Sequence, residues 1–177
     1  MCAIEIEPVL RTRRLALRRP RKADAPRIAE YCNDFDVARM TSKVPYPYGL
    51  ADAEAFLERL DYKDPEHEIT FAIEHPDDGL VGVMGFFDND EGRPEIGYWL
   101  GRPHWGKGYA TEAAERALVW ANKTWGRRYV VAGHFSDNPA SGQVLCKLGF
   151  LYTGEVKPLA STARGAEVPV RMMVWLA

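Results

Sequence analysis

A glycine-containing turn in the middle of the chain has the residue types and spacing of a phosphate-binding site. It reads Trp105-Gly106-Lys107-Gly108-Tyr109-Ala110-Thr111-Glu112-Ala113 and joins an expected strand to an expected helix. Gly106 and Gly108 carry no Cβ, so the backbone N–H groups of residues 106–110 can converge on one anion. The positive end of the following helix favours the same anion. The turn therefore predicts a site for the phosphates of a ligand.

The same turn departs from two common nucleotide-binding patterns. A Walker loop places Ser or Thr after its lysine to bind magnesium, whereas Gly108 follows Lys107 here. A dinucleotide fingerprint needs a third glycine, whose place Thr111 takes, and a repeated strand-helix-strand unit that this sequence lacks. We therefore disfavour a nucleotide-dependent oxidoreductase. Because Gly-x-Gly before a helix also occurs in ordinary loops, the turn alone leaves its ligand open.

Periodic segments on either side of the turn indicate how it is held. The segment 95–100 is aromatic and β-branched, which predicts a strand. After the turn, small apolar side chains recur at helical spacing and let a helix lie close on a sheet: Ala110, Ala113, Ala114, Ala117, Leu118, Ala121 and Trp125. The segment 129–135 predicts a second strand. A strand-helix-strand unit of this kind makes a right-handed parallel crossover.

The rest of the chain predicts further strands and short helices, without internal repeats. We expect strands at 14–18, 69–74, 80–87, 151–156 and 168–176, a polar lead-in at 1–12 and a connection at 161–167. We expect helices after Asp24, around 36–40, from Asp52 and after Asn138, the last of them ending at Gly149. Together these elements predict one domain over residues 1–177, of the α/β (α+β) class with a mixed sheet.

Composition narrows the class of protein. Hydrophobic residues make up 46% and charged residues 27% of the 177 residues, as in water-soluble globular proteins. The net charge of -2 gives no general affinity for nucleic acid. The arginine-rich run from Arg11 to Lys22 is interpreted as a solvated strand face and turn, whose charges are offset by acidic residues elsewhere. The histidines show no close His/Cys pairing, so we expect no metal site.

Cysteine usage and hydropathy predict a cytoplasmic location. Cys2, Cys32 and Cys146 are scattered and odd in number, which is typical of reduced thiols. The first residues show no apolar signal segment, and no apolar run reaches the roughly 18 residues that a membrane span needs. We therefore expect no membrane association, and a monomer or a homodimer.

Three motifs, taken together and in this order, resemble those of a known superfamily. They are Glu95-Ile96-Gly97-Tyr98-Trp99-Leu100, the glycine turn with its helix, and Asn138-Pro139-Ala140-Ser141 through Lys147-Leu148-Gly149-Phe150. The chain looks like a GNAT acetyl-coenzyme A dependent N-acetyltransferase of the RimJ/RimL-like branch, over nearly its whole length. The resemblance implies a mixed, mostly antiparallel sheet of about seven strands, one parallel splayed pair, and helices on both faces. It also implies acetyl-CoA as cosubstrate.

The resemblance also implies which residues contact the coenzyme. In the superfamily, the pyrophosphate binds to backbone N–H groups in a pattern of Arg or Gln, two residues, Gly, one residue, then Gly or Ala. Gly108 and Ala110 fit this pattern, whereas Trp105 replaces the polar first residue. Pantetheine would pair with the open backbone between the splayed strands. The implied cofactor-binding residues are Trp99, Leu100, Trp105, Gly106, Lys107, Gly108, Tyr109, Ala110, Thr111, Asn138 and Lys147.

Two residues match positions that carry acid-base chemistry in relatives. An ammonium must lose a proton before it attacks, and a leaving thiolate gains from a proton or a hydrogen bond. Glu95 matches a general base that commonly acts through water, and the alternative is an ordinary exposed glutamate at a strand end. The tyrosine acid of many relatives is replaced by Leu145. Ser141 resembles the acid proposed for the RimL-like branch, and the alternative is a capping residue of its own helix.

The amine acceptor stays open at this stage. Relatives acetylate protein N-termini as well as small-molecule amines, and the sequence does not choose between them. We expect the acceptor between the loop 44–49 and the connection 157–167, where Tyr46, Tyr48 and Glu167 offer aromatic faces and a negative charge. The two tyrosines would equally serve to pack the loop. The alternative function is a non-catalytic module that binds or senses acyl-CoA.

Overall fold

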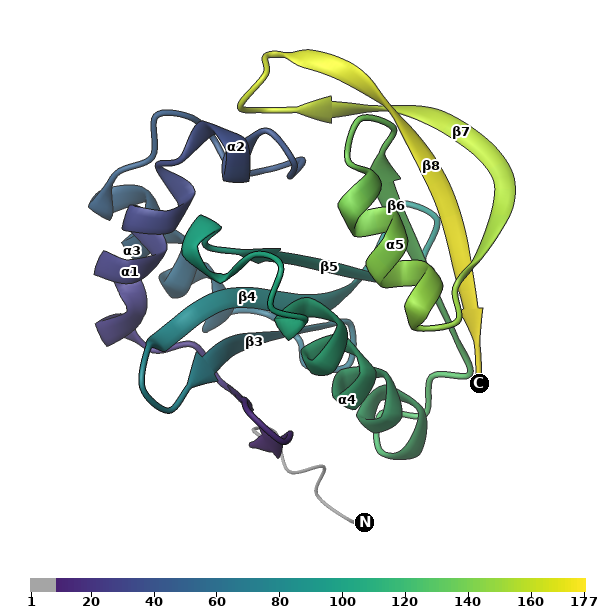
Figure 1. Cartoon of the computed structure of the whole chain (residues 1–177), viewed down its shortest axis with the longest axis horizontal. Coiled ribbons are helices and arrows are strands. Elements are labelled where there is room, and N and C mark those ends of the chain that lie inside the picture. The colour runs from purple at the N-terminus through teal and green to yellow at the C-terminus, as the bar shows by residue number, and fades with distance from the viewer. Residues whose placement is uncertain (1–8) are drawn as a thin grey trace.

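A twisted sheet runs through the computed structural model, which describes residues 9–177 (Figure 1). Within these residues the sheet has eight strands in the order β1-β2-β3-β4-β5-β6-β8-β7. The strands are β1 (Leu10–Arg11), β2 (Ala16–Arg18), β3 (Glu68–His75), β4 (Gly79–Asp88), β5 (Pro94–Leu100), β6 (Tyr129–Phe135), β7 (Leu151–Ser161) and β8 (Ala166–Leu176). The helices are η1 (Lys22–Asp24), α1 (Ala25–Cys32), α2 (Phe35–Ala38), α3 (Leu50–Leu60), η2 (Arg102–His104), α4 (Tyr109–Lys123) and α5 (Pro139–Lys147).

The predicted fold class is confirmed, with one strand more than expected. Every neighbouring pair in the described sheet is antiparallel except β5 and β6, which run parallel on either side of the α4 crossover. The extra strand is β1, which lies in the segment expected to be a polar lead-in. Leu10 is 3% exposed and pairs with Leu17, because its side chain joins the core beside β2. The first eight residues of that expected lead-in lie outside the described part of the chain.

The parallel pair opens into a split. Within the described strands, β5 and β6 are in register at one position, where Glu95 lies opposite Val131. Both residues lie near the starts of their strands, so the strands diverge toward their C-terminal ends. Divergence leaves backbone groups on the facing edges without a strand partner. The split predicted from the family resemblance is therefore present, and its closed end is at Glu95.

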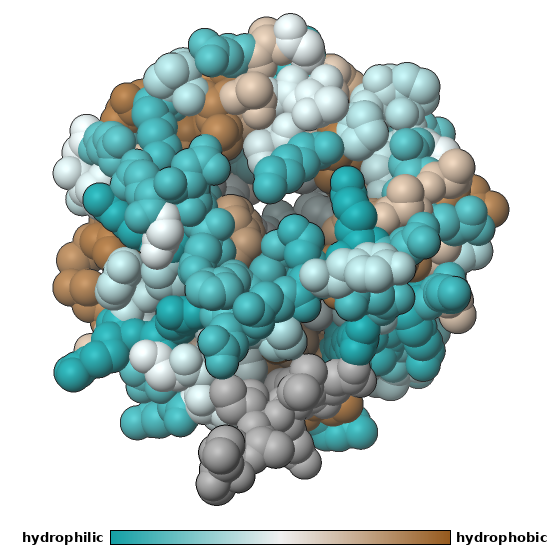
Figure 2. Space-filling model, turned by 180° about the vertical axis from the view of Figure 1, so that it is seen from behind, coloured by the Kyte–Doolittle hydropathy of each residue, from teal (hydrophilic) through white to brown (hydrophobic). Residues whose placement is uncertain are grey.

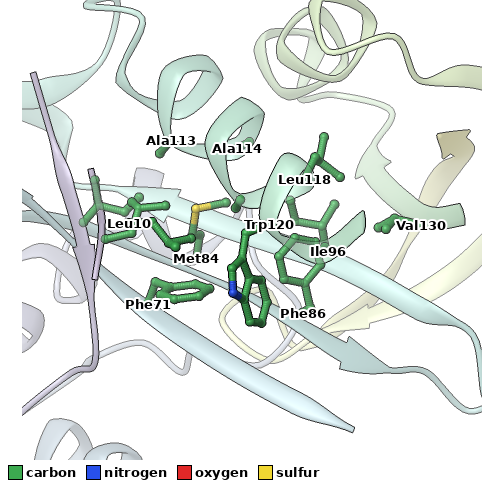
Figure 3. Packing of buried hydrophobic residues seen from close by; sticks show 14 of the residues in the cluster. Leu10, Phe71, Met84, Phe86, Ile96, Ala113, Ala114, Leu118, Trp120 and Val130 are labelled. Atoms are coloured by element: carbon green, nitrogen blue, oxygen red, sulfur yellow. The ribbon is translucent and has the colours of Figure 1, made fainter. Parts of the chain in front are cut away.

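Helices cover both faces of the sheet. The alanine face of α4 packs on β3, β4 and β5, where Ala113, Ala114 and Ala117 are fully buried against residues such as Phe71 and Ile96 (Figure 3). The small side chains let the helix axis approach the sheet, as the periodicity predicts. On the opposite face, α1 and α3 bury a second cluster that contains Ile28 and Leu57. The two faces of β5 are consequently different environments.

Helix boundaries follow local capping chemistry. The Asn138 side chain accepts a hydrogen bond from the Ser141 N–H at 3.3 Å, which makes Asn138 the predicted N-cap of α5. Helix α3 begins at Leu50, two residues before the expected start. The cause is Asp52, whose carboxylate accepts from the Gly49 N–H at 2.8 Å and therefore occupies the third helical position.

The C-terminal hairpin is longer than predicted. Strands β7 and β8 pair as far as Ser161 opposite Ala166, so the turn shrinks to residues 162–165. Much of the expected connection, including Glu167, is therefore strand. The hairpin arches past α5 toward the segment that follows α2 (Figure 1). Pairing extends this far because the turn is held from outside by that segment.

Two other predictions concern charge and hydropathy. Several arginines of the run that begins at Arg11 are offset by acidic residues, as expected: Arg18 contacts Asp24 at 2.8 Å and Glu74 at 2.7 Å. Within residues 9–177, no helix combines the length and apolar character that crossing a membrane requires.

Candidate active site

The glycine turn forms an open cradle at the start of α4. Gly106 and Gly108 have φ values of +73° and +77°, in the left-handed region that glycine adopts without strain. Gly108 is the N-cap of α4, so the first N–H groups of the helix, at residues 109–111, point out of its end without intrahelical acceptors. A Cβ added to Gly106 would meet no atom within 4 Å. The cradle therefore has both the free donors and the room that an anion needs.

Contacts from α1 and α2 fix the segment that leads into the cradle. Helix η2 carries Arg102, whose guanidinium forms an ion pair with Asp34 and contacts Asp36 at 2.6 Å. His104 is 6% exposed, and its Nε2 is hydrogen-bonded to the Tyr31 hydroxyl at 2.7 Å. Burial lowers the pKa of His104, so its ring stays neutral near pH 7. The cradle is thus attached to the helices on the far side of the sheet.

Side chains of the turn and of the N-terminal segment surround the cradle. The Trp105 indole N–H donates to the Leu100 carbonyl at 2.8 Å, so this residue braces the turn in place of the polar residue of the family pattern. Tyr109 is buried, with the Lys107 ammonium 5.9 Å and the Arg14 guanidinium 4.8 Å from its ring centre. Arg14 also lies 3.4 Å from the position of a Gly108 Cβ. Sequence reasoning missed Arg14, because nothing local links it to the turn.

A depression of about 690 Å³ continues from the cradle along α4. Its lining includes Arg13, Thr111, Arg116 and Lys147. Lys147 comes from the end of α5, so the depression lies between two helices that the sequence separates. Glu112 and Glu115 also line it, so three cations share the depression with two carboxylates, and the Glu112 carboxylate is paired with Arg14. Four predicted cofactor residues, Gly108, Thr111, Lys147 and the adjoining Ala110, therefore lie together.

Alternation along β5 separates two sets of side chains. Tyr98 and Leu100 pack with the α4 cluster, whereas Trp99 packs with the α1 and α3 cluster. Because side chains of a strand alternate between faces, Glu95 and Gly97 share the face of Trp99. The backbones of Trp99 and Leu100 follow the edge of the split. Groups at the closed end can therefore act from opposite sides of the sheet.

Glu95 lies at the closed end on the α1 and α3 face. Its Oε2 accepts a hydrogen bond from the Asn89 amide at 3.1 Å, which orients the carboxylate. Phe87 lies directly opposite Glu95 on β4 and projects from the same face. Gly97 has no side chain on that face. The space that its Cβ would occupy borders the Phe87 ring, at 3.4 Å. A carboxylate, an aromatic ring and an empty strip thus meet at one point.

Two hydroxyl groups face each other on the opposite side of the split. The Tyr98 hydroxyl lies 2.9 Å from the Ser141 Oγ and 3.3 Å from the Ser141 carbonyl oxygen, so β5 and α5 are joined there. Burial raises the pKa of Tyr98 to about 12, which keeps its hydroxyl protonated at neutral pH. Asn138, not the Ser141 hydroxyl, caps the helix. Tyr98 was not predicted as a site residue, although strand alternation in the sequence places it on the face of β5 opposite to Glu95.

The predicted acceptor residues separate in space. Tyr46 is 46% exposed and packs edge-on against Phe35, with ring centres 5.2 Å apart. Tyr48 is 7% exposed within the α1 and α3 cluster, which corrects its prediction as a substrate wall. The loop must fill the space between two helices, and Tyr48 does so. Glu167 is exposed on β8 and does not belong to a connecting loop.

The turn of the C-terminal hairpin closes over the acceptor side. The Thr162 N–H and hydroxyl both donate to the Ser42 carbonyl, at 2.9 and 3.0 Å. Arg164 contacts Asp137 at 2.6 Å and donates to the Arg39 carbonyl at 2.8 Å. We call these contacts the clasp. Figure 2, seen from the side opposite α4 and α5, shows a hollow near the middle of the molecule, in the region between the α2 loop and the hairpin of Figure 1.

Metal-binding side chains do not cluster in the described part of the chain. No group of three or more His, Cys, Asp or Glu residues there has the arrangement to hold an ion. Cys32 and Cys146 are both free thiols.

The mixed sheet with its split parallel pair and glycine cradle is the GNAT fold. A family model for the acetyltransferase (GNAT) domain matches residues 14–151, and the chain belongs to this family. It is 28% identical over 167 residues to the uncharacterized N-acetyltransferase p20 of Bacillus licheniformis, with 92% of this chain and 93% of p20 covered.

Solved structures show the same fold. A GNAT-family acetyltransferase from Bacillus anthracis superposes with a TM-score of 0.82 at 22% identity, covering 96% of this chain and 98% of that one. RimL, described as a ribosomal L7/L12 α-N-protein acetyltransferase in complex with coenzyme A, superposes with a TM-score of 0.82 at 17% identity and the same coverage of both chains. At these identities the likeness establishes the fold alone.

Proposed function

We propose that this chain transfers an acetyl group from acetyl-CoA directly to a primary amine, as an N-acetyltransferase of the RimJ/RimL-like branch. One observation carries the proposal. The split between β5 and β6 opens toward a glycine cradle, with a carboxylate at its closed end on one face of β5 and, three residues further along the strand, two hydroxyls on the other face. Acyl transfer to an amine needs a proton acceptor near the amine and a proton donor near the leaving group. The two faces provide them separately.

The residues of the cradle fit the phosphates and pantetheine of the coenzyme. N–H groups of residues 106–111 would hold the pyrophosphate, with Lys147 and Arg13 adding positive charge nearby. The open edge at Trp99 and Leu100 would pair with the pantetheine amides, and the Asn138 Nδ2 remains free to donate. Acetyl-CoA, when bound, supplies an acetyl group activated as a thioester.

Glu95 is the proposed general base. Its carboxylate lies on the face from which an acceptor enters, and it accepts a hydrogen bond from Asn89 that leaves its second oxygen available. This oxygen would take the proton of the acceptor ammonium, directly or through a water molecule. Phe87, opposite Glu95, offers its ring face to the same cation.

Ser141 is the proposed proton donor to the leaving thiolate, and we add Tyr98 to this role because the two hydroxyls are in contact. A hydroxyl donates more readily when it accepts a hydrogen bond itself, because the chain of hydrogen bonds is cooperative. The 2.9 Å contact allows Tyr98 to donate to Ser141 while Ser141 donates to the sulfur. The second proton lost by the acetylated nitrogen would then restore the pair.

The acceptor is a small amine or a protein N-terminus. Tyr46 and Glu167 remain proposed contacts for its outer part. RimL, by its description, modifies a ribosomal protein N-terminus. This likeness suggests the same class of acceptor without fixing it.

The test begins with cofactor binding. Gly108→Val should abolish acetyl-CoA binding in calorimetry, because a branched side chain at φ +77° strains the turn and fills the cradle. Gly126→Val is the matched control, since Gly126 has φ +75° and a Cβ there meets nothing within 4 Å. The Gly126→Val control should be less stable than the wild type but should still bind acetyl-CoA. Equal binding by both variants, within about threefold, would contradict the cradle.

Turnover is tested next with a panel of amines and peptides. Release of free thiol from acetyl-CoA should depend on an added amine and on Glu95. Tight binding of acetyl-CoA without turnover on any acceptor would favour the non-catalytic module instead. Absence of binding in the wild-type protein would overturn both functions.

A further inference from the structure

The clasp fixes the backbone next to Lys43. Lys43 follows Ser42, whose carbonyl accepts the two hydrogen bonds from Thr162. The Ser161 hydroxyl also donates to the Thr41 carbonyl at 3.3 Å. Three hydrogen bonds therefore fix the backbone immediately before Lys43, whereas its side chain is exposed and free to change rotamer.

The Lys43 ammonium lies over a residue of the proposed catalytic face. Its Nζ is 5.5 Å from the centre of the Phe87 ring. Phe87 lies directly across from Glu95 on the same face of the sheet, beside the bare strip at Gly97. An amine of the chain itself thus occupies the neighbourhood where an acceptor ammonium must lose its proton.

Other charges around this hollow do not hold Lys43. Among residues 9–177, no carboxylate lies within ion-pair range of its ammonium. By contrast, Lys157 on β7, in the same part of the molecule, lies 3.5 Å from Glu91 of the β4–β5 turn. An ion pair keeps an amine protonated and in place, while a contact with an aromatic face constrains it less. Lys43 is therefore the mobile amine of the two.

We propose that Lys43 is a site of self-acetylation, modified within its own molecule by the active site described above. The inference rests on the proposed function. Glu95 takes a proton from the Lys43 ammonium, and the neutral Nζ forms a bond to the acetyl carbon. The carbon–sulfur bond breaks, and its electron pair leaves on sulfur, which takes a proton from the Ser141 and Tyr98 pair. The second proton of the nitrogen restores the Ser141 and Tyr98 pair, and Glu95 releases the first to solvent, so the products are acetyl-lysine, free coenzyme A and one proton.

Acetylation changes what the hollow presents to an acceptor. It removes the positive charge of Lys43, and with it the attraction to the Phe87 ring. An ammonium that enters from solvent then meets no like charge near Glu95. Self-acetylation would therefore raise the affinity of the hollow for cationic acceptors.

The experiment is incubation of the purified chain with acetyl-CoA, without added amine, followed by peptide mapping in a mass spectrometer. Lys43 should be acetylated about tenfold or more faster than Lys123, because proximity raises its effective concentration. Lys123 is the matched reference, since it is exposed at the end of α4, outside the hollow. The fraction modified per unit time should not change with protein concentration, as expected for a reaction within one molecule.

Two variants separate enzymatic from chemical acetylation. Gly108→Val, which lacks cofactor binding, should acetylate Lys43 no faster than Lys123. Lys43→Arg keeps the charge and should lose the modified peptide while its melting temperature is unchanged. Equal rates at Lys43 and Lys123 in the wild-type chain, or an unchanged Lys43 rate in Gly108→Val, would overturn the proposal. If Lys43 stays unmodified while an added amine is acetylated, self-acetylation is wrong and the proposed function stands. If calorimetry shows no acetyl-CoA binding, both fail.

Discussion

Replacing Tyr98 by Phe removes one hydroxyl and leaves the ring packed between β5 and α5. The lost contacts are those to the Ser141 Oγ at 2.9 Å and to the Ser141 carbonyl at 3.3 Å. A hydrogen bond of this kind contributes about 1 kcal/mol to the free energy of unfolding. A domain stable by roughly 5–15 kcal/mol stays folded after this loss. Any large fall in turnover would therefore report on chemistry and not on folding.

The expected fall in turnover is about 10²-fold, the lower end for loss of a positioned proton donor, which equals roughly 2.7 kcal/mol. Tyr98 and Ser141 act on the same proton, so their losses should not add. Ser141→Ala combined with Tyr98→Phe should be little worse than the more damaging single variant. Additive losses would show that the two hydroxyls serve different purposes.

The pH dependence gives an independent check. Burial raises the pKa of Tyr98 to about 12, so the hydroxyl is protonated over the working range of the assay and would be lost only as pH rises through that value. The Tyr98→Phe defect should therefore be constant below about pH 10. The same raised pKa contributes stability that is present below about pH 10 and is lost as the pH rises toward 12.

Initial rates of thiol release, measured with acetyl-CoA and with an acetyl thioester of a more acidic thiol, test the role directly. An acidic leaving group needs less help, so the Tyr98→Phe defect should shrink with the second substrate. The reasoning is refuted if Tyr98→Phe turns over acetyl-CoA within about twofold of the wild type, or if the defect is the same for both thioesters.

Three further predictions address the base, the clasp and the core. Glu95→Gln should lower turnover about 10²-fold near neutral pH and less at high pH, where the amine is already neutral; a defect that does not change with pH would remove Glu95 as the base. Arg164→Ala should raise the Michaelis constant for the amine and not for acetyl-CoA, because it opens the clasp to Asp137; an equal effect on both would place the acceptor elsewhere. Leu145→Ala, at 1% exposure, should lower the free energy of unfolding by about 3 kcal/mol in urea titrations, and a loss below about 1 kcal/mol would show that the site collapses around the cavity.

Much of the cofactor side was predictable because its signals are local. The glycines of the turn, the alanine face of α4 and the Asn138 cap each act over a few residues, and the structure has all of them. Element boundaries were less predictable. The start of α3 depended on one Asp52 carboxylate, and the length of β7 and β8 depended on the clasp.

The acceptor side was less predictable because its contacts join distant segments. Tyr46 and Tyr48 look alike in the sequence, but α1 and α3 bury one and leave the other at the surface. Glu167 was expected in a loop and lies in a strand. Whether a loop residue is buried or faces the site depends on how the neighbouring helices pack against the loop, and the sequence of the loop does not contain that information.

The sequence by itself determined most of the elements, the parallel crossover and the glycine cradle, since helical periodicity, glycine conformation and capping are properties of short segments. Only the tertiary structure decided which groups from distant segments meet around the split and the cradle. Tyr98 and Ser141 are 43 residues apart, and the Arg14 N–H and Glu112 are 98 apart, yet their atoms lie at 2.9 and 2.7 Å. Such contacts form only when distant segments pack on the same sheet. Bringing those segments together has an entropic cost that the packing of the whole domain offsets, so no short stretch of sequence specifies the contact.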